Sequence, residues 1–248
     1  MKTTSLLLPH RSYCRQENEL TAKPVWSLEE LGRSGEILLD IQRSWETLKR
    51  EAEMLVTSHP WTGETSGWTR GEKVLEESGR WQQLVVAGTG YPDPPPELCQ
   101  TAPVLCSLAD QLYEGGSCPG GQIKLSVMAG PTHVKPHCGT SNARLRSHLP
   151  LLVPSDPPPQ LRVVDQHLTW QEGEILVFDD SFEHEVIHQS NKTRIVLILD
   201  INHPELSEEK RAWYEEHLVV EGYDVDGPRF NLKRDENIDI NENKKDEL

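Results

Sequence analysis

The sequence has no long apolar run, little positive charge and few cysteines. No stretch of its 248 residues is apolar enough to cross a bilayer as a helix. The short run Leu6-Leu7-Leu8 is also shorter than the apolar region of a secretory signal peptide. The formal net charge of −15 argues against nucleic acid as a partner, because the phosphate backbone repels an acidic protein. Five cysteines are too few for a disulfide-scaffold protein.

Two of these cysteines lie close enough in the chain for a local bridge. Cys99 and Cys106 are separated by six residues and follow a proline-rich segment. Such a short closed loop stabilises a fold only modestly. The pair is expected to be oxidised in an oxidising compartment and to remain two thiols in the cytosol.

The two ends of the chain differ from its middle. Residues 1–23 have no clear periodicity and are expected to be a leader or linker, which leaves residues 24–222 as one domain. Residues 223–248 form an acidic tail that we expect to be disordered. The last four residues, Lys-Asp-Glu-Leu, spell the signal that retains soluble proteins in the endoplasmic reticulum. We therefore expect the lumen of that compartment, with an accidental end to an acidic tail as the alternative.

Helical patterns are concentrated in the first half of the domain. Apolar residues recur at helical spacing over residues 36–55, which predicts an amphipathic helix. Shorter helices are expected over residues 72–77 and 106–113, and a last helix over residues 207–217.

Short strands are predicted after Gly121. The ranges with strand character are 122–128, 144–153, 161–164, 174–178, 185–188 and 193–201. No internal repeat is evident. Many short strands after a helical lead-in predict a mainly β fold, a double-stranded β-helix (a cupin-like jelly roll), with mostly N-terminal helices packed outside.

Two histidines are the candidate metal ligands. His137 and His184 lie 47 residues apart, each at the edge of a predicted strand. Oxygenase sites on jelly rolls hold Fe(II) with two histidines and usually a carboxylate. The usual place for that carboxylate, two residues after the first histidine, is Gly139 here. Taken alone, two histidines are more often structural than metal-binding. Asp179 and Asp180 are expected to orient neighbouring groups.

Several cationic residues lie near these histidines in the predicted strands. Arg194 follows His184 by ten residues, and its guanidinium could hold a buried carboxylate through two hydrogen bonds. Arg144, Arg146 and His148 alternate along one strand and therefore share a face. That face either lines the interior, where it needs anionic partners, or is exposed to solvent. The spacing leaves both possibilities open.

Residues from about 23 to 213 resemble the catalytic domain of the aspartyl/asparaginyl β-hydroxylase (aspartate β-hydroxylase) family. The most specific segment is 178–186, Phe-Asp-Asp-Ser-Phe-Glu-His-Glu-Val, which resembles the second iron-ligand strand of that family. The other matching segments are 23–26 at the entry to the domain, 121–128 as its first core strand, 130–146 as its first iron-binding region, and Asp200 with 203–206.

This resemblance implies an Fe(II)- and 2-oxoglutarate-dependent dioxygenase. Such an enzyme uses O2 to hydroxylate the β-carbon of Asp or Asn in protein substrates such as EGF-like domains. The family lacks the carboxylate ligand and has glycine at the position of Gly139, so His137 and His184 alone are expected to hold the metal. The residues implied to contact 2-oxoglutarate are Ser126, Arg146, His148 and Arg194, with Trp81 and Ser147 nearby; Arg144 is implied to face the substrate carboxylate, and Cys99 and Cys106 match the family's disulfide.

Two features leave the substrate open. Glu76 stands where the best-known family members have an arginine that helps to hold the substrate. Asn191-Lys192-Thr193 is an N-glycosylation sequon between His184 and Arg194. The alternatives are a jelly-roll binding protein without turnover, the same chemistry on another substrate, and a zinc site. Two histidines without a third protein ligand make a poor zinc site.

Overall fold

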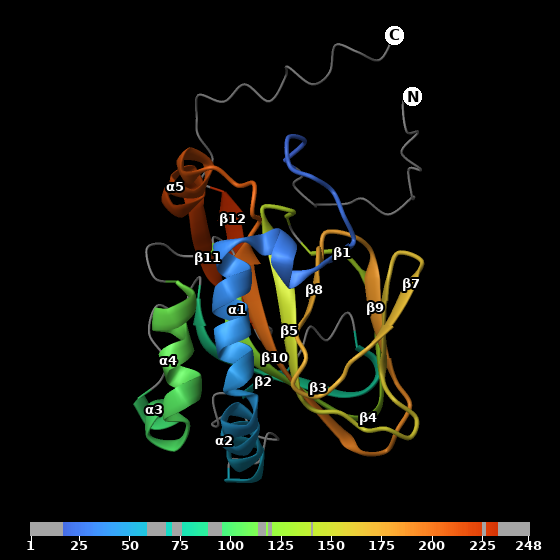
Figure 1. The fold of residues 1–248 in the computed structure, drawn as a ribbon. Coiled ribbons are helices and arrows are strands. Elements are labelled where there is room, and N and C mark those ends of the chain that lie inside the picture. The colour runs from blue at the N-terminus through green and yellow to red at the C-terminus, as the bar shows by residue number, and fades with distance from the viewer. Residues whose placement is uncertain are drawn as a thin grey trace.

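The computed structural model describes residues 17–58, 68–70, 76–88, 96–113, 118, 121–139, 141–224 and 227–232. The helices are η1 (Leu28–Leu31), α1 (Arg33–Arg43), α2 (Trp45–Ser58), α3 (Pro96–Thr101), α4 (Pro103–Leu112) and α5 (Glu208–His217). The strands are β1 (Val25–Trp26), β2 (Trp68–Arg70), β3 (Glu76–Gly88), β4 (Gln122–His137), β5 (Arg144–Leu152), β6 (Gln160–Val163), β7 (Gln166–Thr169), β8 (Leu176–Phe178), β9 (His184–His188), β10 (Thr193–Asn202), β11 (Leu218–Asp224) and β12 (Gly227–Leu232) (Figure 1).

One long strand turns the main sheet into two facing halves. The strand order is β1-β8-β5-β10-β4-β9-β6-β7, and all these pairs are antiparallel. The first half of β4 pairs with β10, and its last residues, from Thr132 to His137, pair with β9. From β5 to β10 the chain crosses between the halves at every connection except the β6–β7 hairpin, as in a double-stranded β-helix. The predicted fold is therefore confirmed.

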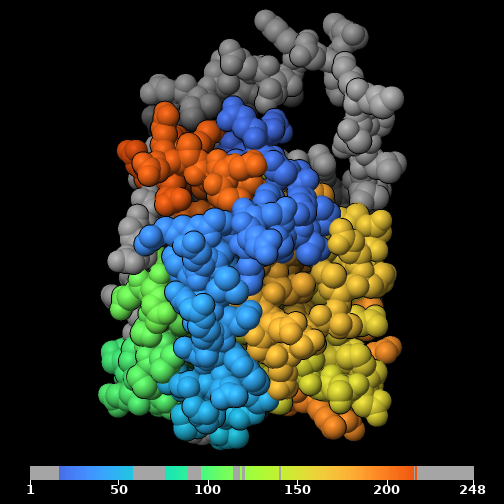
Figure 2. All heavy atoms as spheres, viewed as in Figure 1, coloured from blue at the N-terminus to red at the C-terminus, as the bar shows by residue number. Residues whose placement is uncertain are grey.

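The outer face of the larger half-sheet is covered by the N-terminal helices. Alternate residues of β4, β5 and β10, such as Leu125 and Leu197, belong to one buried cluster with Leu38 of α1, Leu48 of α2 and Leu105 of α4. Figure 1 shows α1 and α2 running along this face, and Figure 2 shows the blue helices between the green helices and the yellow strands of the smaller half-sheet. The helices thus leave the opposite face of the sheet for the interior.

The interior is the space between the two half-sheets. It is lined by a second buried cluster: Trp81, Met128, Val134, Leu161, Val163, Trp170, Phe178 and Val186. Because side chains alternate along each strand, the residues that flank these positions by two in sequence also face the interior.

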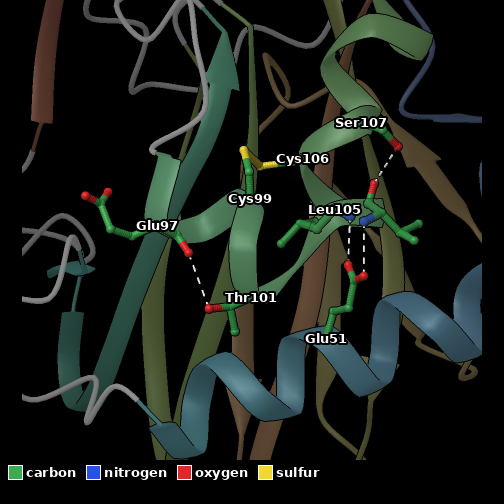
Figure 3. The surroundings of a disulfide bond; sticks show 8 residues. Glu51, Glu97, Cys99, Thr101, Leu105, Cys106 and Ser107 are labelled. Carbon is green, nitrogen blue, oxygen red and sulfur yellow. Dashed lines mark hydrogen bonds between the residues drawn. A yellow bond between two sulfur atoms is a disulfide. The ribbon is translucent and has the colours of Figure 1, made fainter.

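The disulfide and a buried carboxylate hold the helices α3 and α4 in place (Figure 3). The expected bond between Cys99 and Cys106 is present and joins α3 to α4. Glu51 of α2 accepts hydrogen bonds from the backbone N–H groups of Val104 and Leu105, at 3.0 and 2.8 Å (Figure 3). These N–H groups are at the start of α4, so a side chain from another helix satisfies them.

Two helix predictions differ from the structure. In place of the single helix predicted over residues 36–55 there are two helices, α1 and α2, separated at Ser44. The backbone N–H of Ser44 donates to Ile41 O at 3.0 Å. The helix predicted over residues 72–77 is wrong at its end, because Glu76 begins β3; residues 72–75 lie outside the described residues. Pairing of β3 with β4 along its length overrides the local helical preference.

The expected leader and tail also contain ordered structure. Glu17 is bonded to Asn142, and Thr21 to Glu205, so the end of the range 1–23 is attached to the domain. β11 and β12 pair as a hairpin, so the first part of the range 223–248 has strand structure up to Leu232. The range 233–248, with the retention signal, lies outside the described residues. No helix among the described residues is long and apolar enough to cross a membrane.

Candidate active site

The two candidate metal ligands are neighbours in the structure. β4 ends at His137 and β9 begins at His184, and the two residues are paired in register. Their ring centroids lie 4.1 Å apart. The Nδ1 atom of His137 lies 2.7 Å from Lys135 O, and that of His184 lies 2.9 Å from Phe182 O. A carbonyl partner assigns the proton to Nδ1 and the lone pair to Nε2, the form in which an imidazole binds a metal.

His184 is held in its neutral form. His184 is buried, and burial together with the neighbouring His137 lowers its pKa to about 3. His137 is only partly buried, so the pair lies at the boundary between the interior and solvent. A neutral, oriented His184 beside the oriented ring of His137 is available to a metal at physiological pH.

The carboxylate of Asp180 occupies the space where the side chain of a third metal ligand usually lies. A Cβ atom at Gly139 would lie 2.5 Å from Cγ of Asp180, so no side chain fits there. Among the described residues, no group of three His, Cys, Asp or Glu is placed to hold a metal. The residues present therefore fit an ion that takes two ligands from the protein and the others from water or a cosubstrate.

Arg144 and Arg146 face the interior and have carboxylate partners there. Arg144 lies 3.0 Å from Asp180 and 3.0 Å from Asp200, and Arg146 lies 3.0 and 2.8 Å from the same two residues. Burial alone raises the pKa of each aspartate, but the two arginines outweigh burial and lower it. This ionised group of four resolves the alternative that the sequence left open: the face is interior.

Arg194 is buried without such a partner. It lies on β10 next to Met128 of β4, which is next to Trp81 of β3. Its exposed fraction is 1%, and its Nη1 atom lies 3.6 Å from Met128 Sδ. Within the part of the chain that the structure describes, its Nε atom has no hydrogen-bond partner. No described carboxylate forms an ion pair with it. Burial lowers its pKa to about 9, so it remains a cation at neutral pH and can receive an anion.

Three more predicted residues line the same interior, and one does not. Trp81 Nε1 donates to Ser126 Oγ at 3.0 Å. His148 is buried, and its Nε2 atom has no hydrogen-bond partner among the described residues. Ser147 is also buried, but it is paired with Leu199, whose side chain belongs to the cluster under the helices. Alternation places Ser147 on that outer face.

A family model described as aspartyl/asparaginyl beta-hydroxylase matches residues 42–204. The chain belongs to the aspartyl/asparaginyl β-hydroxylase family. The protein of that name from Mus musculus is 35% identical over 194 residues, which are 78% of this chain and 25% of that protein. The chain spans about a quarter of the length of such curated relatives.

Two further proteins are similar to parts of this chain. An ornithine lipid ester-linked acyl 2-hydroxylase from Rhizobium tropici is 43% identical over 81 residues, 32% of this chain and 28% of that protein. A solved prolyl-4-hydroxylase from Pseudomonas putida aligns with a TM-score of 0.42 and 11% identity, over 64% of this chain and 86% of that one.

Glu76 and the glycosylation sequon at Asn191, the two features that bear on the substrate, lie at different places in the domain. Glu76 begins β3 and accepts a hydrogen bond from the Trp81 backbone N–H at 3.0 Å, so it lies beside the interior. Asn191 is exposed in the turn between β9 and β10.

Sequence reasoning missed one residue of this site altogether. Trp170 lies directly after β7, where no periodic pattern marks it, and it contacts both His148 and Arg194. The sequence analysis also did not pair Asp180 and Asp200 with the arginines of β5. The signal for Asp200 was present, because it is a lone acidic residue in the apolar strand β10.

Proposed function

We propose that the protein is an Fe(II)- and 2-oxoglutarate-dependent dioxygenase that hydroxylates the β-carbon of Asp or Asn residues in protein substrates such as EGF-like domains. The observation that carries this proposal is the close pair His137 and His184, of which His184 is neutral, in the same interior as Arg194, a buried arginine without an ion-pair carboxylate among the described residues. The pair suits a ferrous ion, and the arginine suits the carboxylate of an oxo-acid.

The residues divide between the two cofactors. His137 and His184 would hold the iron, and Arg194, His148 and Ser126 would hold 2-oxoglutarate. Iron and 2-oxoglutarate together supply the activation of O2, which no amino-acid side chain can provide. The protein supplies position, charge and exclusion of water: the apolar cluster that includes Phe178 surrounds the polar groups.

Arg144 and Arg146 have a different part in this proposal. Each is already bonded to Asp180 and Asp200, so an incoming carboxylate has to compete with these partners. Arg146 remains a candidate contact for 2-oxoglutarate, and Arg144 for the substrate carboxylate. Glu76 beside Trp81 adds a negative charge near the same interior and disfavours an acidic side chain that binds close to it.

The protein substrate and the compartment rest on separate support. The names of two similar relatives, from Mus musculus and Homo sapiens, include aspartyl and asparaginyl, which favours those side chains. The Cys99–Cys106 disulfide favours an oxidising compartment such as the lumen of the endoplasmic reticulum. The relative that acts on an ornithine lipid favours, as a second candidate, the same chemistry on another class of substrate.

The test is incubation of an EGF-like peptide with purified protein, Fe(II), 2-oxoglutarate and O2, followed by mass spectrometry of the peptide and measurement of succinate. We expect one added oxygen on Asp or Asn that requires all three additions and is absent with His184→Ala. Succinate without a modified peptide would support the second candidate. Neither signal, from a folded and iron-loaded protein, would favour a binding protein without turnover.

A further inference from the structure

Trp170 lies between two groups of the proposed 2-oxoglutarate site. It is 5% exposed and belongs to the interior apolar cluster. Its Nε1 atom lies 3.2 Å from Nδ1 of His148, and its ring centroid lies 3.9 Å from Cζ of Arg194. One side chain therefore contacts both the buried imidazole and the buried guanidinium.

The contact with His148 fixes the position of a proton. An indole N–H can only donate a hydrogen bond, so the Nδ1 atom of His148 has to accept it. Burial, and then the charge of Arg194, lowers the pKa of His148 well below its ordinary value, so the ring is neutral. A neutral ring that accepts at Nδ1 carries its proton on Nε2. That Nε2–H group is buried and has no hydrogen-bond partner in the described structure.

The contact with Arg194 stabilises a charge without neutralising it. A guanidinium over an indole ring is held by the electrons of the ring face. This interaction uses the flat face of the guanidinium, whereas its N–H bonds lie in its plane. A carboxylate partner would occupy those N–H bonds, as Asp180 and Asp200 do for Arg146. The indole leaves them available to a ligand.

We propose that Trp170 is a positioning residue for 2-oxoglutarate. It keeps Arg194 charged but without a carboxylate partner, and it fixes His148 as an Nε2–H donor. Both donors then serve the same dianion. This inference rests on the proposed function and deepens it, because it explains why a guanidinium without a carboxylate partner and an imidazole N–H without a hydrogen-bond partner, both judged among the described residues, lie in one interior.

Three variants separate this role from simple packing. Trp170→Phe keeps an aromatic ring against Arg194 and removes the N–H group, and Trp170→Leu removes both contacts. Trp26→Phe is the matched control, because Trp26 is 7% exposed and its Nε1 atom donates to Lys23 O at 2.8 Å, in the cluster under the helices. The control loses the same kind of hydrogen bond outside the interior.

The measurement is the Kd of 2-oxoglutarate by calorimetry on Mn(II)-loaded protein without turnover, together with Tm, kcat and the KM for 2-oxoglutarate. We expect Trp170→Phe to raise Kd and KM about tenfold and Trp170→Leu about a hundredfold, with kcat at saturating 2-oxoglutarate changed about twofold at most. We expect Trp26→Phe to lower Tm about as much as Trp170→Phe does, and to leave the Kd of 2-oxoglutarate unchanged. The ¹⁵N shifts of His148 report a single Nε2–H tautomer in the wild type and a mixture in Trp170→Phe.

Two outcomes would overturn the proposal. An unchanged Kd in Trp170→Phe and Trp170→Leu, with a fall in Tm like that of Trp26→Phe, would show a purely structural role while the proposed function stands. A wild-type protein that binds Mn(II) but not 2-oxoglutarate would overturn both this inference and the proposed function. Wild-type binding thus tells the two failures apart, and Trp170→Phe suffices if Trp170→Leu does not fold.

Discussion

Arg144 and Arg146 lie against the carboxylates Asp180 and Asp200, whereas Arg194 lies against the ring of Trp170. A buried charge needs compensation, and these residues receive it in two different ways. The first two arginines are part of a balanced group of four charges. Arg194 keeps its charge for a ligand, so substitutions of these arginines should have different consequences.

Arg194→Lys should raise the KM for 2-oxoglutarate about 10- to 100-fold with a smaller change in kcat. Lysine keeps the charge but cannot form two parallel hydrogen bonds with one carboxylate. Steady-state kinetics with varied 2-oxoglutarate measures the effect. Arg162→Lys is the control, because Arg162 pairs with Glu183 and Glu185 on the outer face of the smaller half-sheet. An unchanged KM in Arg194→Lys would place the cosubstrate elsewhere.

His184→Ala should remove stoichiometric iron binding and leave the protein folded. The substitution removes one of two protein ligands, and the described residues around it provide no third one. Metal analysis after anaerobic loading with Fe(II) measures the loss, and circular dichroism reports the fold. His133→Ala is the control, since His133 is bonded to Glu185. Full iron content in His184→Ala would refute the two-histidine site.

At the scale of elements, several helices and strands depend on partners that are distant in sequence. The residue before α4 is Ala102, whose side chain cannot cap a helix, and Glu51 of α2 performs this role. β3 likewise exists because it pairs with β4. The disulfide within α3 and α4 closes only a short loop, so the attachment of these helices to α2 depends on Glu51 and on apolar packing.

Glu51→Ala should lower the free energy of unfolding by about 2 kcal/mol. The substitution leaves two N–H groups of α4, that of Val104 part-buried and that of Leu105 buried, without acceptors. Urea denaturation at pH 7 measures the loss. Glu53→Ala, two residues along on the same helix and only partly buried, should change the free energy by less than about 0.5 kcal/mol. Equal effects of the two substitutions would mean that α4 does not need this cap.

At the scale of the whole molecule, the buried titratable groups predict how stability depends on pH. Burial lowers the pKa values of His148, His184, His188 and His203. Below pH 6.5 the unfolded chain binds protons at these positions that the folded chain does not bind, so stability falls as the pH falls. Asp179 acts in the opposite direction. Burial raises its pKa to about 6, so the folded protein binds that proton first.

The metal-free protein should therefore lose about 2 kcal/mol or more of stability between pH 7 and pH 5. Each proton bound only by the unfolded chain contributes about 1.4 kcal/mol per pH unit, and four histidines outweigh one aspartate. Urea denaturation at pH 7, 6 and 5 measures this dependence. Asp179→Asn should make the loss steeper, because it removes the opposing group and keeps an oxygen for the Ser181 N–H. Stability that is constant or rises toward pH 5 would contradict the assignment of neutral histidines.

The sequence by itself determined which residues share a face and which segments form most strands. Alternation placed Arg144, Arg146 and His148 together, and the segment around His184 indicated the family. Only the tertiary structure decided that this face is interior, that Asp180 and Asp200 balance its arginines, and that Trp170 contacts Arg194. The reason is physical: a period of two fixes relative orientation within one strand. Burial and charge pairing depend on strands brought together from distant parts of the chain.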